Sequence, residues 1–224
     1  MPSPKQIFGF FVLVLVYCAL LLAPWPGLDG AYAAAFRAGG NVVFHRFWFW
    51  PEGWVRFVDP DARTAVDLPP GVRLPAAEGV KDTVMILENR STPRFLGFLR
   101  TSSREVGYKP TAVLIALMLA TPTSWRRRGK SLLWGLLLVH GFILLRLTVT
   151  LVANGFGADK GYALFHPAEF GMTVLDKLDT VLLMDPTVSY VAPAFFWFLL
   201  AFRPSQWASR GQTEPVPSGS DQSR

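Results

Sequence analysis

Apolar residues gather in long uninterrupted blocks along this chain, with polar stretches between them. The first block, residues 7–25, holds 19 residues without a charge ("IFGFFVLVLVYCALLLAPW"). An apolar stretch of about 20 residues is long enough to cross a bilayer as a helix. Lys5 and the small residues from Ala31 onward also suit a cleaved signal peptide, but the apolar block is longer than such peptides usually have. We therefore predict an uncleaved N-terminal anchor over residues 1–25.

Residues 26–109 follow a different pattern. Pro and Gly in "PWPGLDG" end the first helix. Two β-prone runs flank Asp59-Pro60-Asp61, which is a hairpin signal, and a third run follows. We expect an extracytoplasmic β-rich insert that is too polar to cross lipid and packs on the helix ends, because a lone hairpin is marginally stable. Its predicted strands lie near residues 55–58, 64–67 and 83–87.

A three-helix membrane core is predicted over residues 110–203. Its apolar segments cover residues 110–122, 131–152 and 187–203, and Pro193 should kink the last of them. With the N-terminal anchor, these segments predict an α-helical integral membrane protein with about four transmembrane helices and a small extracytoplasmic β-rich insert.

Two polar segments complete the chain. In residues 154–186, apolar side chains from Val174 to Val181 recur at helical spacing, which indicates an amphipathic helix outside the membrane. Residues 204–224 are rich in Ser, Gly and Gln, and we expect a disordered cytoplasmic tail.

Basic residues fall at alternate ends of the predicted helices. They are Lys5, the group Arg126, Arg127, Arg128 and Lys130, and the pair Arg203 and Arg210. Because cytoplasmic loops carry the excess of Lys and Arg, both termini are predicted to be cytoplasmic. The protein is then a multi-pass protein of the inner or plasma membrane.

Composition narrows the classes of function. Only 17% of residues are charged, against about 25% in soluble domains, and 51% are hydrophobic. The net charge of +6 is spread along the chain, so we expect no nucleic-acid partner. A single cysteine, Cys18, excludes an intrachain disulfide. Three scattered histidines make no metal site, and no nucleotide or haem motif is present, so no cofactor is expected.

Arg146 stands inside the apolar run "LLVHGFILLRLTVTLVANGFG". A charge at the centre of a bilayer costs roughly 2.5–3.5 kcal/mol on insertion scales. We therefore expect Arg146 to have a structural or functional role that offsets this cost. One interpretation is chemical, because an Arg can hold an oxyanion or carboxylate. The glycine-rich connection after it would let His166 fold back beside it, where a His can shuttle a proton near neutral pH.

Structural roles for the same residues remain open. Arg146 can instead pair with a carboxylate of the following segment, namely Glu169, Asp176 or Asp179, or extend to the interface. His166 can be a solvated loop residue. A structural hydrogen bond suits His140, and aromatic packing suits His45 in "VVFHRFWFW".

The stretch "ATPTSWRRRGKSLLWGLLLVHGFILLRLTVTLV", followed by His166, resembles the core of the exosortase/archaeosortase family. These are multispanning membrane transpeptidases, proposed to cleave a C-terminal sorting signal from exported proteins. In the family, a short helix ends in a Pro-containing basic turn, the next helix carries an Arg, and a His follows about 20 residues later, at positions that Arg146 and His166 match. The family nucleophile is a Cys at the outer start of the short helix.

This chain departs from the family at the nucleophile. "TSSREVGYKPTAVLIAL" has no Cys, and Ser102, Ser103 and Tyr108 occupy the region where it is expected. Cys18 lies in a different helix. Ile143 stands where the family often has an Asn.

Three hypotheses follow. The favoured one is an exosortase-like membrane protein that is non-catalytic and binds or organises a membrane or exported protein partner. The second is an active transpeptidase that processes C-terminal sorting signals, with Ser103 as nucleophile, His166 as general base and Arg146 as oxyanion holder. The third is a structural subunit of a larger membrane complex without any site.

Overall fold

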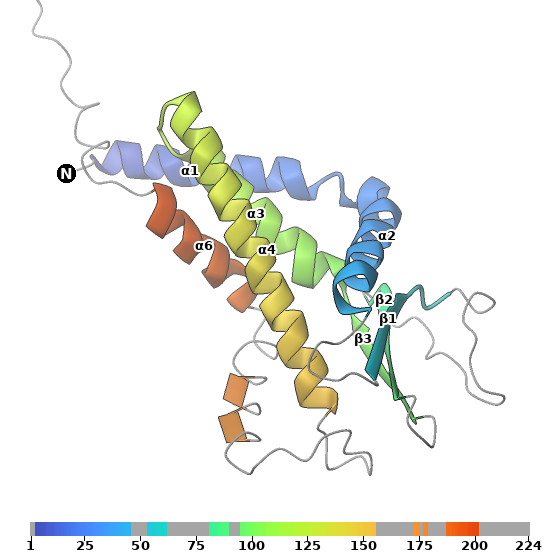
Figure 1. Cartoon of the computed structure of the whole chain (residues 1–224). Helices are drawn as coiled ribbons and strands as arrows, with labels where there is room; N and C mark the ends of the chain where they lie inside the picture. The colour runs from blue at the N-terminus through green and yellow to red at the C-terminus, as the bar shows by residue number, and fades with distance from the viewer. Residues whose placement is uncertain are drawn as a thin grey trace, which may run out of the picture.

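The computed structural model describes residues 3–45, 53–61, 81–89, 95–155, 173–174, 177–178 and 187–201. It is mostly helical, with one small sheet (Figure 1). The helices are α1 (Pro4–Leu22), α2 (Trp25–Phe44), α3 (Lys109–Ala120), α4 (Trp125–Gly155) and α6 (Val188–Ala201), with a π-helix, η1 (Arg104–Tyr108), directly before α3. The strands β1 (Gly53–Val58), β2 (Thr83–Asn89) and β3 (Phe95–Thr101) form an antiparallel sheet in the order β1-β2-β3.

Two of the described helices, α1 and α4, are long and apolar enough to cross a membrane. α1 begins with a capping box, in which Ser3 Oγ accepts from Gln6 N and Gln6 Oε1 accepts from Ser3 N. Phe10 is the one buried residue of α1, and Phe8 and Leu15 are about 70% exposed. The helices α3 and α6 have 12 and 14 residues, shorter than the roughly 20 residues of a typical span.

The expectation that residues 26–109 are β-rich is partly wrong, because residues 25–44 form the helix α2. Alanines at five of these positions favour helix strongly enough to outweigh the glycines, and Pro26 suits a first turn. The predicted strands at 55–58 and 83–87 are confirmed as parts of β1 and β2. The prediction at 64–67 lies outside the described residues, and β3 is a described strand that the sequence did not predict.

A polar side chain joins α2 to the edge of the sheet. Asn41 Nδ2 donates to Phe57 O at 2.9 Å, and Phe57 N donates to Asn41 Oδ1 at 2.7 Å. The amide thus occupies the free edge of β1 as a neighbouring strand would, which satisfies backbone groups that an edge strand leaves open. Gly40 makes the approach possible, because a Cβ there would lie 2.8 Å from the Phe57 ring.

One hydrophobic core runs through both parts of the molecule. Buried residues of the sheet, including Val55, Phe57, Met85 and Leu87, pack in one cluster with residues of α2, α3, α4 and α6. A smaller cluster joins α1, α3 and α6 through Phe10, Leu117, Ala120 and Trp197. The sheet is therefore packed on the helices, as the sequence predicted, and does not stand as a separate domain.

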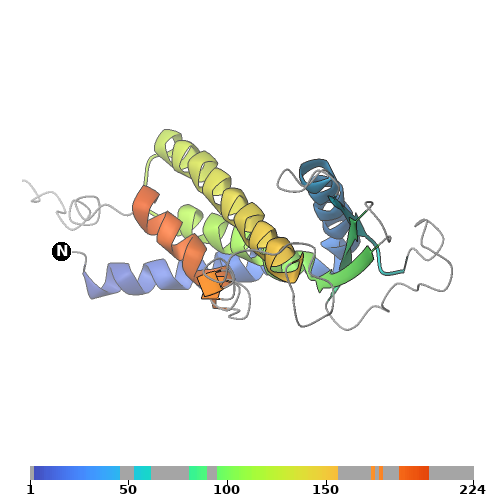
Figure 2. The ribbon, with the colours of Figure 1, turned by 60° about the horizontal axis from the view of Figure 1, so that its bottom comes forward.

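The bundle has two unlike ends (Figures 1 and 2). The N-terminus of α1, the turn between α3 and α4, and the C-terminal end of α6 lie together at one end. The sheet and α2 lie at the other. We call the first the basic end, after Lys5, Arg126, Arg127, Arg128 and Lys130, and the second the sheet end.

Candidate functional site

Arg146 of α4 lies inside the bundle, with 6% of its surface exposed. Its Nη1 donates to Ser189 Oγ at 2.8 Å, and Ser189 Oγ donates to the Glu105 carbonyl at 3.3 Å. The chain of bonds links α4, α6 and η1. Arg146 therefore lies within the bundle and does not extend to the interface, which was one of the roles that the sequence left open.

The partners expected for Arg146 from the sequence cannot be compared with this arrangement. His166, Glu169, Asp176 and Asp179 all lie outside the described residues. Of the predicted amphipathic segment 154–186, residues 173–174 and 177–178 are described, and they are helical and exposed. The Ser189 contact was not anticipated; its only signal in the sequence was a hydroxyl at the start of an otherwise apolar segment.

η1 adjoins two of the candidate residues, because Ser103 precedes it and Arg146 is linked to its Glu105 carbonyl through Ser189. A π-helical turn is rare, and such turns are frequent at functional sites. Ser103 precedes the turn, the Glu105 carbonyl receives the bond from Ser189, and Lys109 follows it. Lys109 Nζ lies 2.6 Å from Glu105 Oε1, which makes a pair one helical turn apart on a partly exposed surface.

Ser103, the candidate nucleophile, is fully buried and bound to a carboxylate. Its Oγ donates to Asp82 Oδ2 at 2.6 Å, and its backbone N donates to Asp82 Oδ1 at 2.9 Å. Thr83 Oγ1 donates to the same Oδ1 at 3.0 Å. Asp82 thus accepts from both the backbone and the hydroxyl of Ser103, which ties the start of η1 to the residue before β2.

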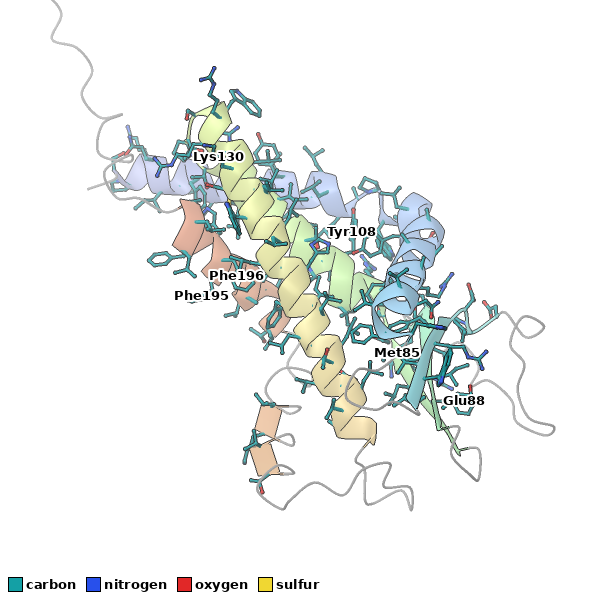
Figure 3. The ribbon with its side chains drawn as sticks, viewed as in Figure 1. Met85, Glu88, Tyr108, Lys130, Phe195 and Phe196 are labelled. Carbon is teal, nitrogen blue, oxygen red and sulfur yellow. The ribbon has the colours of Figure 1, made fainter. Side chains whose placement is uncertain are left out.

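The other residues of the expected nucleophile region also have structural contacts. Ser102 Oγ accepts from Glu105 N at 3.3 Å, as a helix-capping hydroxyl does. The Tyr108 hydroxyl donates to the Leu21 carbonyl, and its ring packs against Trp25 and Tyr32. Tyr108 therefore fixes the corner between α1 and α2, where α3 begins (Figure 3). Burial, with the neighbouring Tyr108, raises the pKa of Tyr32 to about 12, so the phenol stays neutral near physiological pH.

A second set of charged groups holds the sheet end together. Arg37 Nη1 donates to the Asp82 carbonyl at 2.9 Å, and Arg37 Nη2 pairs with Asp59 Oδ2 at 2.8 Å. Arg37 thus joins α2 to the residues that lead out of β1 and into β2. Because the Asp82 carboxylate also accepts from Ser103 at the start of η1, one short polar chain ties α2, the sheet and η1 to each other.

The two described histidines have the roles that the sequence suggested. His140 Nδ1 lies 2.8 Å from the Leu136 carbonyl within α4. The His45 ring meets the Trp54 ring edge-on, with centroids 4.5 Å apart. No group of three or more possible metal ligands occurs in the described part of the chain.

An apolar groove runs between α2 and α4. Its volume is about 290 Å³, and its walls include Phe36, Gly39 and Val43 from α2 and His140, Ile143 and Leu144 from α4. Gly39 faces open space, with nothing within 4 Å of a Cβ placed there. The groove therefore offers an apolar concave surface along a helix that is long and apolar enough to cross a membrane.

No protein-family model, curated protein or solved structure matches this chain. What the molecule does is therefore inferred from the chemistry of its own residues.

Proposed function

We propose that the chain is a multi-pass protein of the inner or plasma membrane, with four spans, cytoplasmic termini and the sheet end outside. The length and apolar composition of α1 and α4 support this, as does the gathering of the basic residues at one end of the bundle. The shorter α3 and α6 would span with the help of their neighbours, since α3 continues from η1 and both pack inside the bundle.

Within this membrane protein, we propose an exosortase-like role that is non-catalytic and consists of binding or organising a membrane or exported protein partner. The observation that carries the proposal is the engagement of the candidate catalytic groups in structural bonds. Ser103 Oγ donates to Asp82, and Arg146 Nη1 donates to Ser189. A serine nucleophile needs a general base within hydrogen-bond reach, and among the described residues its hydroxyl is bonded to Asp82 and to no histidine.

The groove between α2 and α4 is the proposed contact surface for an apolar helical segment of that partner. Small residues on the α2 wall allow a close approach of helix backbones, which is how helices associate in lipid. We choose an apolar helical segment as the occupant because the other wall of the groove belongs to α4, the longest apolar helix of the bundle. Because α2 belongs to the sheet end, a partner would meet the groove at the outer face of the membrane, where its own apolar segment leaves the bilayer.

Purification from native membranes tests the proposal. The wild-type chain should bring down a partner, and Arg146→Lys should bring down less, because it keeps the charge but loses the planar fork that positions α6 against η1. Arg146→Ala should behave similarly and remain inserted, since it removes a costly buried charge. Wild-type levels of partner with both variants would contradict a role of Arg146 in binding.

The position of Ser103 at the start of the helix that precedes the basic turn favours one alternative, an active transpeptidase. In that case Ser103→Ala would abolish the processing of exported proteins that carry C-terminal sorting signals. Under the non-catalytic proposal, Ser103→Ala leaves processing unchanged and affects only stability. A structural subunit, the third possibility, would copurify in a fixed stoichiometric complex that is indifferent to changes in the groove.

A further inference from the structure

The basic end contains cations and no carboxylates among the described residues. Residues 1–28 and 106–157 have no Asp or Glu at all in the sequence, and neither do residues 187–201. The ends of α1, α3, α4 and α6 that meet at the basic end belong to these three stretches. Five basic residues therefore lie at this end with no Asp or Glu among the described residues there: Lys5, Arg126, Arg127, Arg128 and Lys130.

The position of four of these cations at the start of α4 increases the excess of positive charge at the basic end. Four of them lie within the first six residues of α4, and its first turn holds no acidic residue. The N-terminus of a helix already carries a partial positive charge from the aligned peptide dipoles. Basic residues at this place are unfavourable for the isolated helix, and an external anion would offset both the side-chain charges and the dipole.

An aromatic side chain, Trp125, indicates that the basic end lies at the headgroup region of a membrane. Trp125 is 77% exposed, and the Arg128 guanidinium stacks over its ring at 4.7 Å. Arg128 Nη2 also donates to the Thr121 carbonyl at 3.0 Å, so Arg128 is fixed to the turn. Exposed Trp beside basic residues at the end of an apolar helix is typical of the headgroup region. Lys130 lies on α4 at this same end (Figure 3).

We propose that the basic end is a binding surface for the phosphate groups of anionic lipids, with Arg126, Arg127 and Lys130 as the principal contacts. Guanidinium and ammonium groups form charge-assisted hydrogen bonds with phosphate oxygens. Each basic residue close to an anionic membrane surface strengthens binding by roughly fivefold. The surface would select anionic over zwitterionic lipids, and it does so whether or not the chain has an exosortase-like role.

The experiment uses the full chain purified in a mild detergent and offered an equimolar mixture of phosphatidylglycerol and phosphatidylcholine. Native mass spectrometry then counts the lipids that remain bound. The wild-type protein should retain phosphatidylglycerol in clear preference, and rising salt should reduce the preference. The triple variant Arg126→Gln, Arg127→Gln, Lys130→Gln should lose at least tenfold of it. Arg128 is left in place because it holds the turn.

A charge-preserving variant controls for packing. Arg126→Lys with Arg127→Lys keeps every charge and should keep the preference for phosphatidylglycerol. Equal retention of both lipids by the wild type, or an undiminished preference in the glutamine variant, would overturn the proposal. If the glutamine variant fails to fold, two results still test the proposal: the preference of the lysine variant for phosphatidylglycerol and the loss of the wild-type preference at high salt. Displacement of the bound lipid by dilute inorganic phosphate would also overturn it, because the surface would then be a site for the free anion.

Discussion

The sheet end and the basic end of this protein are stabilised in opposite ways. At the sheet end, charged groups meet partners of opposite sign, as Arg37 meets Asp59 at 2.8 Å and Lys109 meets Glu105 at 2.6 Å. At the basic end, helices are joined by ring stacking of Phe10 on Trp197 and by bonds from Trp197 Nε1 to Thr121 Oγ1 and from Ser131 Oγ to the Leu200 carbonyl. Lys5, Arg126 and Lys130 are exposed there. The charges of the sheet end are therefore paired within the chain, whereas the exposed cations of the basic end interact with solvent or with other molecules.

This difference indicates where sequence changes should alter the fold and where they should alter the interaction with the environment. Directional bonds at the sheet end fix the positions of α2, the strands and η1. Exposed charges at the basic end contribute little to the fold, because solvent-exposed side chains away from special features rarely matter by more than about 0.5 kcal/mol. Mutations at the two ends should therefore separate stability from membrane interaction.

The largest effect on stability should come from Asp82→Ala. The substitution leaves three donors without their acceptor, namely Ser103 N, Ser103 Oγ and Thr83 Oγ1. Buried donors without partners are costly, so the free energy of unfolding in detergent should fall by about 3 kcal/mol. Asp61→Ala, at an exposed carboxylate nearby, is the control and should change it by less than about 0.5 kcal/mol. Equal stability of the two variants would show that the Asp82 network is not what holds η1.

The next effect compares two adjacent glycines of α2. Gly40→Ala places a methyl group 2.8 Å from the Phe57 ring, and this overpacking should cost about 1–3 kcal/mol in unfolding free energy. Gly39→Ala meets nothing and should be neutral or stabilising by up to about 1 kcal/mol, because Ala favours helix over Gly. A thermal unfolding scan of both proteins checks the difference. If Gly40→Ala is as stable as Gly39→Ala, α2 does not pack on β1 in the way described.

A third pair tests the groove. Gly39→Leu, on α2, fills the groove. Gly141→Leu adds the same side chain at an open position on α4 that is not part of the groove walls. If a partner helix docks there, Gly39→Leu should weaken copurification roughly tenfold, which corresponds to about 1.4 kcal/mol, and Gly141→Leu should not. Equal loss with both variants would place the contact elsewhere.

The smallest effect is expected at the basic end. Arg126→Gln with Lys130→Gln should change the unfolding free energy in detergent by less than about 0.5 kcal/mol, since both side chains are exposed. A large loss of stability in an uncharged detergent would show that these cations have partners within the chain, against the contrast between the two ends.

Apolar length was a reliable guide to α1 and α4, because an uncharged run of about 20 residues strongly favours a helix that can cross a membrane. The β-prone runs before Asp59 and in "TVMIL" likewise predicted β1 and β2. α2 was missed because four glycines and a proline interrupt its alanine-rich stretch, which hides the helical preference that the alanines supply. Its packing on β1 and η1 adds contacts that are distant in the sequence. β3 was missed because "FLGFLRT" shows no clean alternation and contains a glycine.

The candidate site could be predicted only in part, for a similar reason. The burial of Arg146 follows from the cost of a charge in an apolar helix, which needs no knowledge of the fold. Its contact with Ser189 joins residues 43 positions apart, and Ser103 meets Asp82 across 21 positions. Such pairs depend on how helices and strands are placed in space, and neither residue type signals its partner locally.

The most direct test of the opposition between the two ends is their position relative to the membrane. In a Cys18→Ser background, Asp61→Cys at the sheet end and Lys130→Cys at the basic end each provide a single exposed thiol. Intact cells are treated with a membrane-impermeant thiol reagent, and inverted vesicles with the same reagent. The expected result is labelling of the Asp61→Cys protein only in intact cells and of the Lys130→Cys protein only in inverted vesicles. Labelling of both from the same side would contradict the four-span arrangement and the assignment of the basic end to the cytoplasmic leaflet.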